Sequence, residues 1–285
     1  MSLLPTTEKG RPVMEHLYAV DCHNHSVCSP DGNDPVEAMC ARAADLGLYA
    51  YTLTDHCECQ KFEERYAPRV ERAWAEMAKV KKTLPGDFRF YRGIEMGQPN
   101  QNLPAADAAL QGKEYDFIIG SLHNIRGFED FYFLDYTVQP PDFVDRLLAA
   151  YWQELLEVIE WGNFDSLGHL TYPLRYIEGD HGIPVDLSKH KKQIDEVLLA
   201  LIRAEKALEV NTSGYRQKIG KALPDLPLLA RYRELGGRLV TLGSDAHSTE
   251  DLGKGIDRGM ELLREAGFTE LALYERRSPR MLPLK

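Results

Sequence analysis

The chain has 285 residues, 44% of them hydrophobic and 27% charged, a composition typical of globular proteins. Its 44 acidic residues outnumber its 34 basic ones, which gives a formal net charge of −10. Nucleic acids and anionic membranes are bound through positive charge, so this balance argues against both as partners. No apolar run approaches the ~18 residues of a membrane span, and the first residues lack a secretory apolar core, which predicts a cytoplasmic protein.

The five cysteines are Cys22, Cys28, Cys40, Cys57 and Cys59. Their number is odd, and Cys57 and Cys59 lack the two-residue spacer of redox and zinc-ribbon pairs. We therefore expect reduced, structural thiols, with metal binding by Cys57 and Cys59 as the minor alternative.

Apolar runs with strand character alternate along the chain with helical patterns. In chain order we expect strand 18–21, helix 34–47, strand 49–53, helix 63–82, strands 89–94 and 117–119, helix 141–159, strand 165–167, helix 187–205, strand 207–210, helix 226–235 and strand 238–242. The first helix has the clearest start, because Asp34 as N-cap, Pro35 in the first turn and Glu37 coincide, and Gly47 closes it.

Regular alternation of strand and helix predicts a parallel sheet with helices outside. Seven such strands suggest an α/β barrel of the TIM-like kind, with an open doubly wound sheet as the alternative. We see no internal repeat, low-complexity segment or long linker, so we expect a single domain over residues 1–285.

Six of the seven predicted strands are followed by histidine or carboxylate residues. The carboxyl ends of all strands meet on one face of a parallel barrel, so these side chains should converge on one pocket. In chain order the nine residues are His23, His25, Asp31, His56, Glu95, His123, His169, Asp245 and His247.

Six histidines and three carboxylates in one pocket would suffer repulsion and desolvation, a conflict that divalent cations remove. Alternation along a strand places His23 and His25 on the same side, and the same holds for Asp245 and His247. Nine ligands exceed the needs of one ion, so we predict a site of two or three ions. Each of the nine residues, taken alone, has an ordinary structural explanation. The remaining histidines, His16, His181 and His190, lie outside the strand ends, and for them we expect a structural role and no metal binding.

Two metal ions about 4 Å apart would suit hydrolysis of a phosphate ester. They can share a water, lower its pKa and direct the resulting bridging hydroxide at phosphorus while neutralising the phosphoryl oxygens. This route needs neither a nucleophilic Ser or Cys nor a phosphate-cradling glycine loop. We therefore expect water to supply the nucleophile.

The ordered motifs of this chain resemble those of the polymerase-and-histidinol-phosphatase (PHP) superfamily. They are His23-x-His25, Thr54-Asp55-His56, Gly93-Ile94-Glu95, Gly120-Ser121-Leu122-His123, Gly168-His169 and Gly243-Ser244-Asp245-Ala246-His247. Within that superfamily the chain resembles most the monofunctional histidinol-phosphate phosphatases, through Asp31-Gly32 and the segments 131–136 and 211–216. The resemblance runs from about residue 20 to 253.

The resemblance implies a distorted (β/α)7 TIM-like barrel with three divalent ions, for which zinc, manganese and iron remain open. It implies that His23, His25, Glu95 and Asp245 hold the first ion. Glu95 would bridge to a second ion held by His123 and His169, and Asp31, His56 and His247 would hold the third. Some members have histidine in place of Asp31, which leaves the third metal open.

The implied reaction is hydrolysis of L-histidinol phosphate to L-histidinol and inorganic phosphate in histidine biosynthesis. Glu95, Asp245 and His247 would be the catalytic residues, with Asp245 as a candidate proton relay, and Arg175 and Arg216 would bind phosphate. Asn124, Arg126 and the aromatic residues of segment 128–136 are candidates for shaping the end that holds an imidazole or amine.

Three other hypotheses about the function remain open. A related phosphoesterase would act on another small phosphate ester or on a nucleic-acid 3′ end, although the charge of −10 disfavours the latter. A metal-stabilised module without catalysis is disfavoured by the complete set of candidate ligands. A C–N bond hydrolase of the amidohydrolase type also uses His-x-His, but Glu95, the third-site residues and the two arginines favour phosphate.

Overall fold

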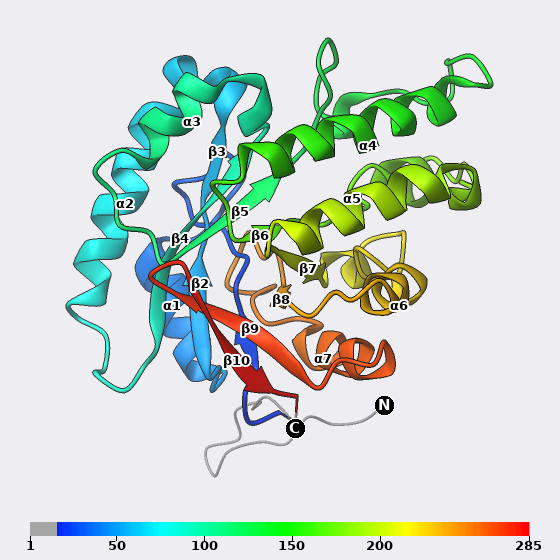
Figure 1. The fold of residues 1–285 in the computed structure, drawn as a ribbon. Coiled ribbons are helices and arrows are strands. Elements are labelled where there is room, and N and C mark those ends of the chain that lie inside the picture. Colours follow the sequence, from blue (N-terminus) through cyan, green and yellow to red (C-terminus); the bar gives the residue numbers. More distant parts are fainter. Residues whose placement is uncertain (1–15, 285) are drawn as a thin grey trace.

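The computed structural model describes residues 16–284, and its centre is a sheet of parallel strands (Figure 1). The strands follow one another in the order β1 (Val20–Asp21), β2 (Ala50–Leu53), β4 (Phe90–Gly97), β5 (Phe117–Ser121), β6 (Ser166–Leu167), β7 (Ala207–Asn211) and β8 (Val240–Gly243). Beyond β8 the chain returns to the residues after β1, because Cys22 N donates to Leu242 O at 2.9 Å and His25 N to Ala246 O at 2.8 Å. The sheet therefore closes into the predicted TIM-like α/β barrel.

Helices surround the sheet, as the alternating pattern predicts. They are α1 (Val36–Asp45), α2 (Ala67–Lys81), α3 (Leu103–Leu110), α4 (Phe143–Trp161), α5 (Lys191–Arg203), α6 (Leu226–Glu234) and α7 (Ile256–Glu265). In α5 the buried side chains recur every three or four residues, at Ile194, Val197, Leu198 and Leu201, which is the stripe of a helix with one face on a core. Among the helices of residues 16–284, none combines the length and apolarity needed to cross a membrane.

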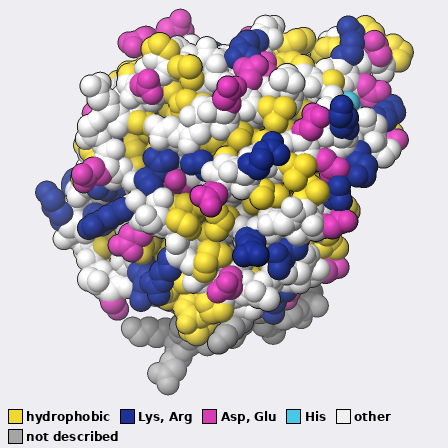
Figure 2. All heavy atoms as spheres, in the orientation of Figure 1, with side chains coloured by type: hydrophobic (Ala, Val, Ile, Leu, Met, Phe, Trp, Pro, Cys, Tyr) yellow, Lys and Arg dark blue, Asp and Glu magenta, His cyan; other side chains and the backbone are white. Residues whose placement is uncertain are grey.

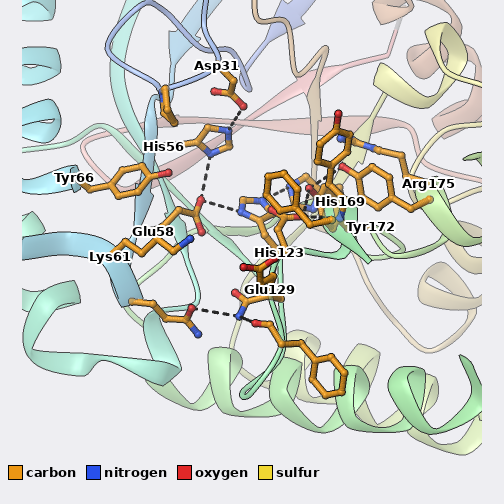
Figure 3. A pocket seen from close by; sticks show the side chains of 18 of the residues that line it. Asp31, His56, Glu58, Lys61, Tyr66, His123, Glu129, His169, Tyr172 and Arg175 are labelled. Carbon is orange, nitrogen blue, oxygen red and sulfur yellow. Dashed lines mark hydrogen bonds and ion pairs between the residues drawn. The ribbon is translucent and has the colours of Figure 1, made fainter. Parts of the chain in front are cut away.

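The seven predicted strands are all present, but the second is followed by an additional short strand, β3 (His56–Glu58). β3 pairs with β4 in a register that sets His56 opposite Glu95. The segment between β3 and α2 is a 3-10 turn (Cys59–Lys61) and a π-helical turn (Phe62–Tyr66) rather than the start of the predicted helix. β3 places Glu58, and this irregular segment places Lys61 and Tyr66, beside the carboxyl ends of the strands (Figure 3).

The prediction that Asp34 caps α1 is wrong. Pro35 occupies the N-cap position, and the Asp34 carboxylate accepts hydrogen bonds from Thr249 N at 2.6 Å and Thr249 Oγ1 at 3.0 Å. Asn33 N also donates to His247 O at 2.8 Å. These contacts tie the segment before α1 to the loop that carries Asp245 and His247, so Asp34 stabilises the site loop instead of the helix end.

A two-stranded antiparallel hairpin of β9 (Glu270–Glu275) and β10 (Ser278–Pro283) closes the end of the barrel where the strands begin (Figure 1). Its Tyr274 ring packs 5.3 Å from Phe117, the first residue of β5, and Arg277 pairs with Asp165, which precedes β6. The hairpin therefore covers the amino ends of the strands and leaves the carboxyl ends open for a site.

Candidate metal centre

All nine predicted ligands lie together at the carboxyl ends of the strands, around the buried side chain of Glu95. One oxygen, Oε2, lies 2.6 Å from His56 Nδ1 and 3.3 Å from His23 Nε2. The other, Oε1, lies 3.0 Å from His169 Nε2 and 3.2 Å from His123 Nε2. The two oxygens of Glu95 thus face two different groups of histidines, the arrangement expected of a bridging carboxylate.

The remaining carboxylates complete the cluster. Asp245 Oδ1 lies 3.3 Å from His25 Nε2 and 3.8 Å from His23 Nε2. Asp31 Oδ2 lies 3.3 Å from His247 Nε2 and 3.6 Å from His56 Nε2, and the Asp31 side chain is 55% exposed. The cluster therefore extends from the fully buried Glu95 to the accessible Asp31.

Buried atoms without hydrogen bonds make this cluster a candidate metal site. His23 Nε2, His25 Nε2, His56 Nδ1 and Glu95 Oε2 are buried and have no hydrogen-bond partner within the described residues. Polar atoms left this way are costly, and a cation would compensate all of them at once. Three sets of potential ligand atoms lie within 4.8 Å of one another: His23, His25 and Glu95; His56, Glu95 and His123; and His25, His56 and His247. Imidazole and carboxylate donors suit zinc, manganese and iron, so the residues fit the predicted ions.

Burial and neighbouring charges shift the pKa values of these histidines in both directions. Burial, reinforced by neighbouring His56 and His247, holds the pKa of His25 well below its usual range. Burial also lowers the pKa of His169. Burial would raise the pKa of Glu95, but positive charge on His23, His56 and His123 outweighs it and keeps that pKa well below its usual range. Against burial, nearby carboxylates raise the pKa of three others: Glu209 raises that of His23, Glu95 that of His56, and Glu58 that of His123, to about 10. Imidazoles bind a cation in their neutral form, so these three would release their protons when a cation binds.

Backbone geometry at the strand ends aims the ligands. Asn24 forms a parallel bridge with Ala246, and its N–H donates to Thr54 Oγ1 at 3.0 Å, so its flanking residues His23 and His25 face the same side, as predicted. His169 and Asp245 hold left-handed backbone, with φ of 21° and 54°. Such conformations are strained in residues other than glycine and concentrate at functional sites.

A cavity of about 580 Å³ opens beside the cluster. Six of the nine candidate ligands line it: Asp31, His56, His123, His169, Asp245 and His247. Its remaining wall carries both charged and aromatic groups, including Glu58, Lys61, Arg65, Glu129, Asp130, Tyr132, Phe133, Tyr172, Arg175 and Tyr176. Tyr172 and Arg175 stand next to His169 and His123 in Figure 3. The cavity can therefore hold a small polar molecule against the cluster.

The two arginines predicted to bind phosphate have different surroundings. Arg175 lines the cavity, its Nη2 donates to Asp245 Oδ2 at 3.0 Å and Ser213 Oγ at 2.8 Å, and its buried Nε has no partner within the described residues. Arg216 is not among the described residues that line the cavity. Its Nη2 donates to Ser244 O at 2.9 Å and Asp245 O at 3.4 Å, so it contacts the backbone of the site loop.

Two acidic residues that the sequence analysis did not single out touch the cluster. Glu58 Oε1 lies 3.0 Å from His123 Nδ1, and Glu209 Oε1 lies 2.6 Å from His23 Nδ1. Glu58 stands two residues after His56 on β3 and so faces the same side, but the sequence does not predict that strand. Glu209 lies inside a predicted strand rather than after it, so the strand-end pattern gives no signal for it.

The other predicted residues have mostly structural surroundings. Arg126 pairs with Glu157 at 2.6 Å, whereas Asn124 lines the cavity. Of the aromatic residues, Phe131 and Tyr136 are buried in the core, while Phe128, Tyr132 and Phe133 line the cavity. His16 contacts Arg264, His181 packs on Tyr136, and His190 is buried with Asp145 3.9 Å away, so none of these histidines joins the described cluster. All five cysteines lie within the described residues as buried free thiols.

The fold and the site define a class of protein: α/β barrels that gather a histidine and carboxylate metal centre at the carboxyl ends of their strands. The chain belongs to the PHP domain family, whose model matches residues 21–213. It is 32% identical over 254 residues to a probable histidinol-phosphatase of Thermotoga maritima, covering 89% of this chain and 95% of the relative. It is 26% identical to a histidinol-phosphatase of Lactococcus lactis, covering 90% and 94% of the two chains.

A solved structure has the same fold. The histidinol phosphate phosphatase of Lactococcus lactis, crystallised with zinc, L-histidinol and phosphate, superposes with a TM-score of 0.77 at 24% identity, covering 92% of this chain and 99% of that one. The match confirms the predicted TIM-like barrel of the family.

Proposed function

We propose that this protein is a metal-dependent phosphomonoesterase that hydrolyses L-histidinol phosphate to L-histidinol and inorganic phosphate. The observation that carries the proposal is the position of Glu95, whose two oxygens each face separate histidines at 2.6 to 3.3 Å next to a cavity lined by Arg175. The histidinol-phosphatase names of two relatives that align over about 90% of the chain support the substrate.

Three ions would be held as follows. His23, His25, Glu95 and Asp245 would hold the first, and Glu95, His123 and His169 the second. Asp31, His56 and His247 would hold the third. Zinc is the leading candidate because it is present in the Lactococcus lactis structure, with manganese and iron as alternatives. When bound, such ions neutralise phosphoryl oxygens and lower the pKa of water.

The residues of the chain itself would bind and orient the substrate. Arg175 lines the cavity, and its Nε has no hydrogen-bond partner within the described residues, so N–H groups of this guanidinium remain to bind phosphate oxygens. Asp245 Oδ2 lies 3.0 Å from Arg175 Nη2, so a phosphate held by Arg175 lies close to this carboxylate. We assign Asp245 as the proton relay, which takes a proton from the attacking water and passes it to the oxygen of the leaving alcohol.

The rest of the cavity wall suits a cationic, aromatic leaving group. Glu129 and Asp130 supply negative charge, and Tyr132 and Phe133 supply ring surface. An amine would pair with the carboxylates and an imidazole would stack on the rings.

The substrate is tested by comparing kcat/KM for L-histidinol phosphate with that for a panel of other small phosphate esters and 3′-phosphorylated oligonucleotides, all with metal-loaded protein. We expect L-histidinol phosphate to be preferred over every other compound. A higher kcat/KM for another ester or for a 3′ end would show that L-histidinol phosphate is not the preferred substrate. The assignment as a metal-dependent phosphoesterase would still stand. Absence of phosphate release from every compound would refute the phosphatase assignment.

A further inference from the structure

Glu209 is a buried carboxylate that touches two candidate metal ligands without being one of them. It lies on β7, and its side chain is 2% exposed. Oε1 lies 2.6 Å from His23 Nδ1, and Oε2 accepts a hydrogen bond from the backbone N–H of His169 at 2.7 Å. His23 follows β1 and His169 follows β6, so one side chain joins two strand ends that are distant in sequence.

The contact with His23 selects which ring nitrogen faces the cluster. An imidazole that donates from Nδ1 to a carboxylate keeps the lone pair on Nε2. His23 Nε2 lies 3.3 Å from Glu95 Oε2 and 3.8 Å from Asp245 Oδ1, and it makes no hydrogen bond within the described residues. The nitrogen left free by Glu209 is therefore the one that points at the other ligands.

The contact with His169 holds a strained backbone. His169 has a φ of 21°, in the left-handed region that favours glycine. Its N–H is fixed by Glu209 Oε2 while its ring Nε2 lies 3.0 Å from Glu95 Oε1. Without that acceptor the N–H would be buried and unpaired, and relaxation of the backbone would turn the ring away from Glu95.

The surrounding chain leaves room for this carboxylate. A Cβ on Gly243 would lie 2.8 Å from Glu209 Oε1 and 2.3 Å from His23 Cβ, so only glycine fits there. Asn211 Nδ2 donates to Oε2 at 3.3 Å. Glycine at this strand end thus admits Glu209 to the ring of His23.

We propose that Glu209 is a positioning residue that orients His23 and His169 for metal binding at the same time. In the proposed assignment these histidines serve different ions, so Glu209 couples the two ion sites. The inference rests on the proposed metal-dependent function, because it requires both histidines to be ligands. Partners of this kind contribute about 10- to 100-fold to metal affinity.

Glu209→Gln tests the proposal at constant size. A carboxylate accepts hydrogen bonds on both oxygens, whereas an amide has one acceptor oxygen and one donor NH2. Glutamine can therefore satisfy His23 Nδ1–H or His169 N–H but not both. Glu154→Gln is the matched control, because Glu154 is also buried and accepts hydrogen bonds from Gln101 Nε2 and Arg126 N, and none of its hydrogen bonds within the described residues involves a candidate ligand.

The readout is the zinc dissociation constant, measured by competition with a chromophoric chelator on metal-free protein, together with the thermal unfolding temperature of that metal-free protein. We expect Glu209→Gln to bind zinc about 10- to 100-fold more weakly than wild type while remaining folded, and Glu154→Gln to bind as wild type does. If wild type binds zinc and Glu209→Gln binds it with the same dissociation constant, this inference is overturned and the proposed function stands. Failure of wild type to bind zinc, manganese or iron would overturn the proposed function and this inference with it.

A second measurement needs no variant and decides the matter if Glu209→Gln does not fold. Long-range 1H–15N NMR of the zinc-loaded wild-type protein reports which ring nitrogen of His23 carries the proton. The proposal requires the proton on Nδ1. A proton on Nε2 would overturn it.

Discussion

Replacing Arg175 by alanine should weaken phosphate handling while leaving the metal content intact. Arg175 is 11% exposed, and its Nη2 is already committed to Ser213 and Asp245. Nε is unpartnered within the described residues, and the N–H groups on Nε and Nη1 can form charge-assisted bonds to phosphate. Two such bonds at about 1.5 kcal/mol each give about 3 kcal/mol, which corresponds to a roughly 150-fold lower kcat/KM.

The assay is steady-state phosphate release from L-histidinol phosphate, with inhibition by inorganic phosphate and metal content measured on the same preparations. Arg175→Lys should recover part of the loss, because it restores the charge but not the planar fork. A kcat/KM for Arg175→Ala within about threefold of wild type would refute the assignment of Arg175 to phosphate.

Arg216→Ala separates the two arginines that the sequence predicts as phosphate ligands. The Arg216 guanidinium donates to the carbonyls of Ser244 and Asp245, so its removal should loosen the site loop and lower kcat/KM by less than about tenfold. A loss as large as that of Arg175→Ala would instead show that Arg216 contacts phosphate in the working enzyme.

Three further outcomes are expected. Glu95→Ala should lose bound metal and phosphate release together, because both of its oxygens face candidate ligand nitrogens, and full turnover by this variant would contradict the bridging role. Chelation should lower the thermal unfolding temperature, because an ion bound only to the native state stabilises it. The expected shift is roughly 5–10 °C if the free ion concentration was about 100 times its Kd, and calorimetry that shows no shift would contradict metal binding to the native state. Hydrogen bonds from Arg231 lower the pKa of Asp195 to about 2, so this pair stabilises the fold above pH ~4 and the contribution is lost as the pH falls from there towards 2. The pair is partly exposed, so Asp195→Asn should cost about 1 kcal/mol in urea unfolding at pH 7 and almost nothing at pH 2, and an equal cost at both values would contradict the assignment.

The barrel could be predicted because its buried parallel strands appear in the sequence as short apolar runs. The 238–242 run and β8, for example, nearly coincide. β3 was not predicted because its residues, His56, Cys57 and Glu58, have no apolar strand pattern, and only its pairing with β4 makes it a strand. α3 was not predicted because its eight residues are mostly small and lack a stripe of large apolar side chains.

The candidate ligands could be predicted because a parallel barrel turns positions after strands into neighbours in space. That rule brought His23 and His247 into one cluster from opposite ends of the chain. It gave no information on residues that act through another side chain, such as Glu209, or on the partners of a loop arginine such as Arg216. Nor could it foresee that Asp34 would bond to Thr249 rather than cap its own helix, because that choice depends on which segments the fold brings together.

The central claim is that this cluster holds metal ions required for phosphate release. The most direct test measures phosphate release from L-histidinol phosphate and bound metal per chain in the same samples, before chelation, after chelation and during stepwise return of zinc or manganese. The account predicts that turnover disappears with the metal and returns in proportion to the ions rebound. Undiminished turnover by protein shown to be free of metal would contradict it.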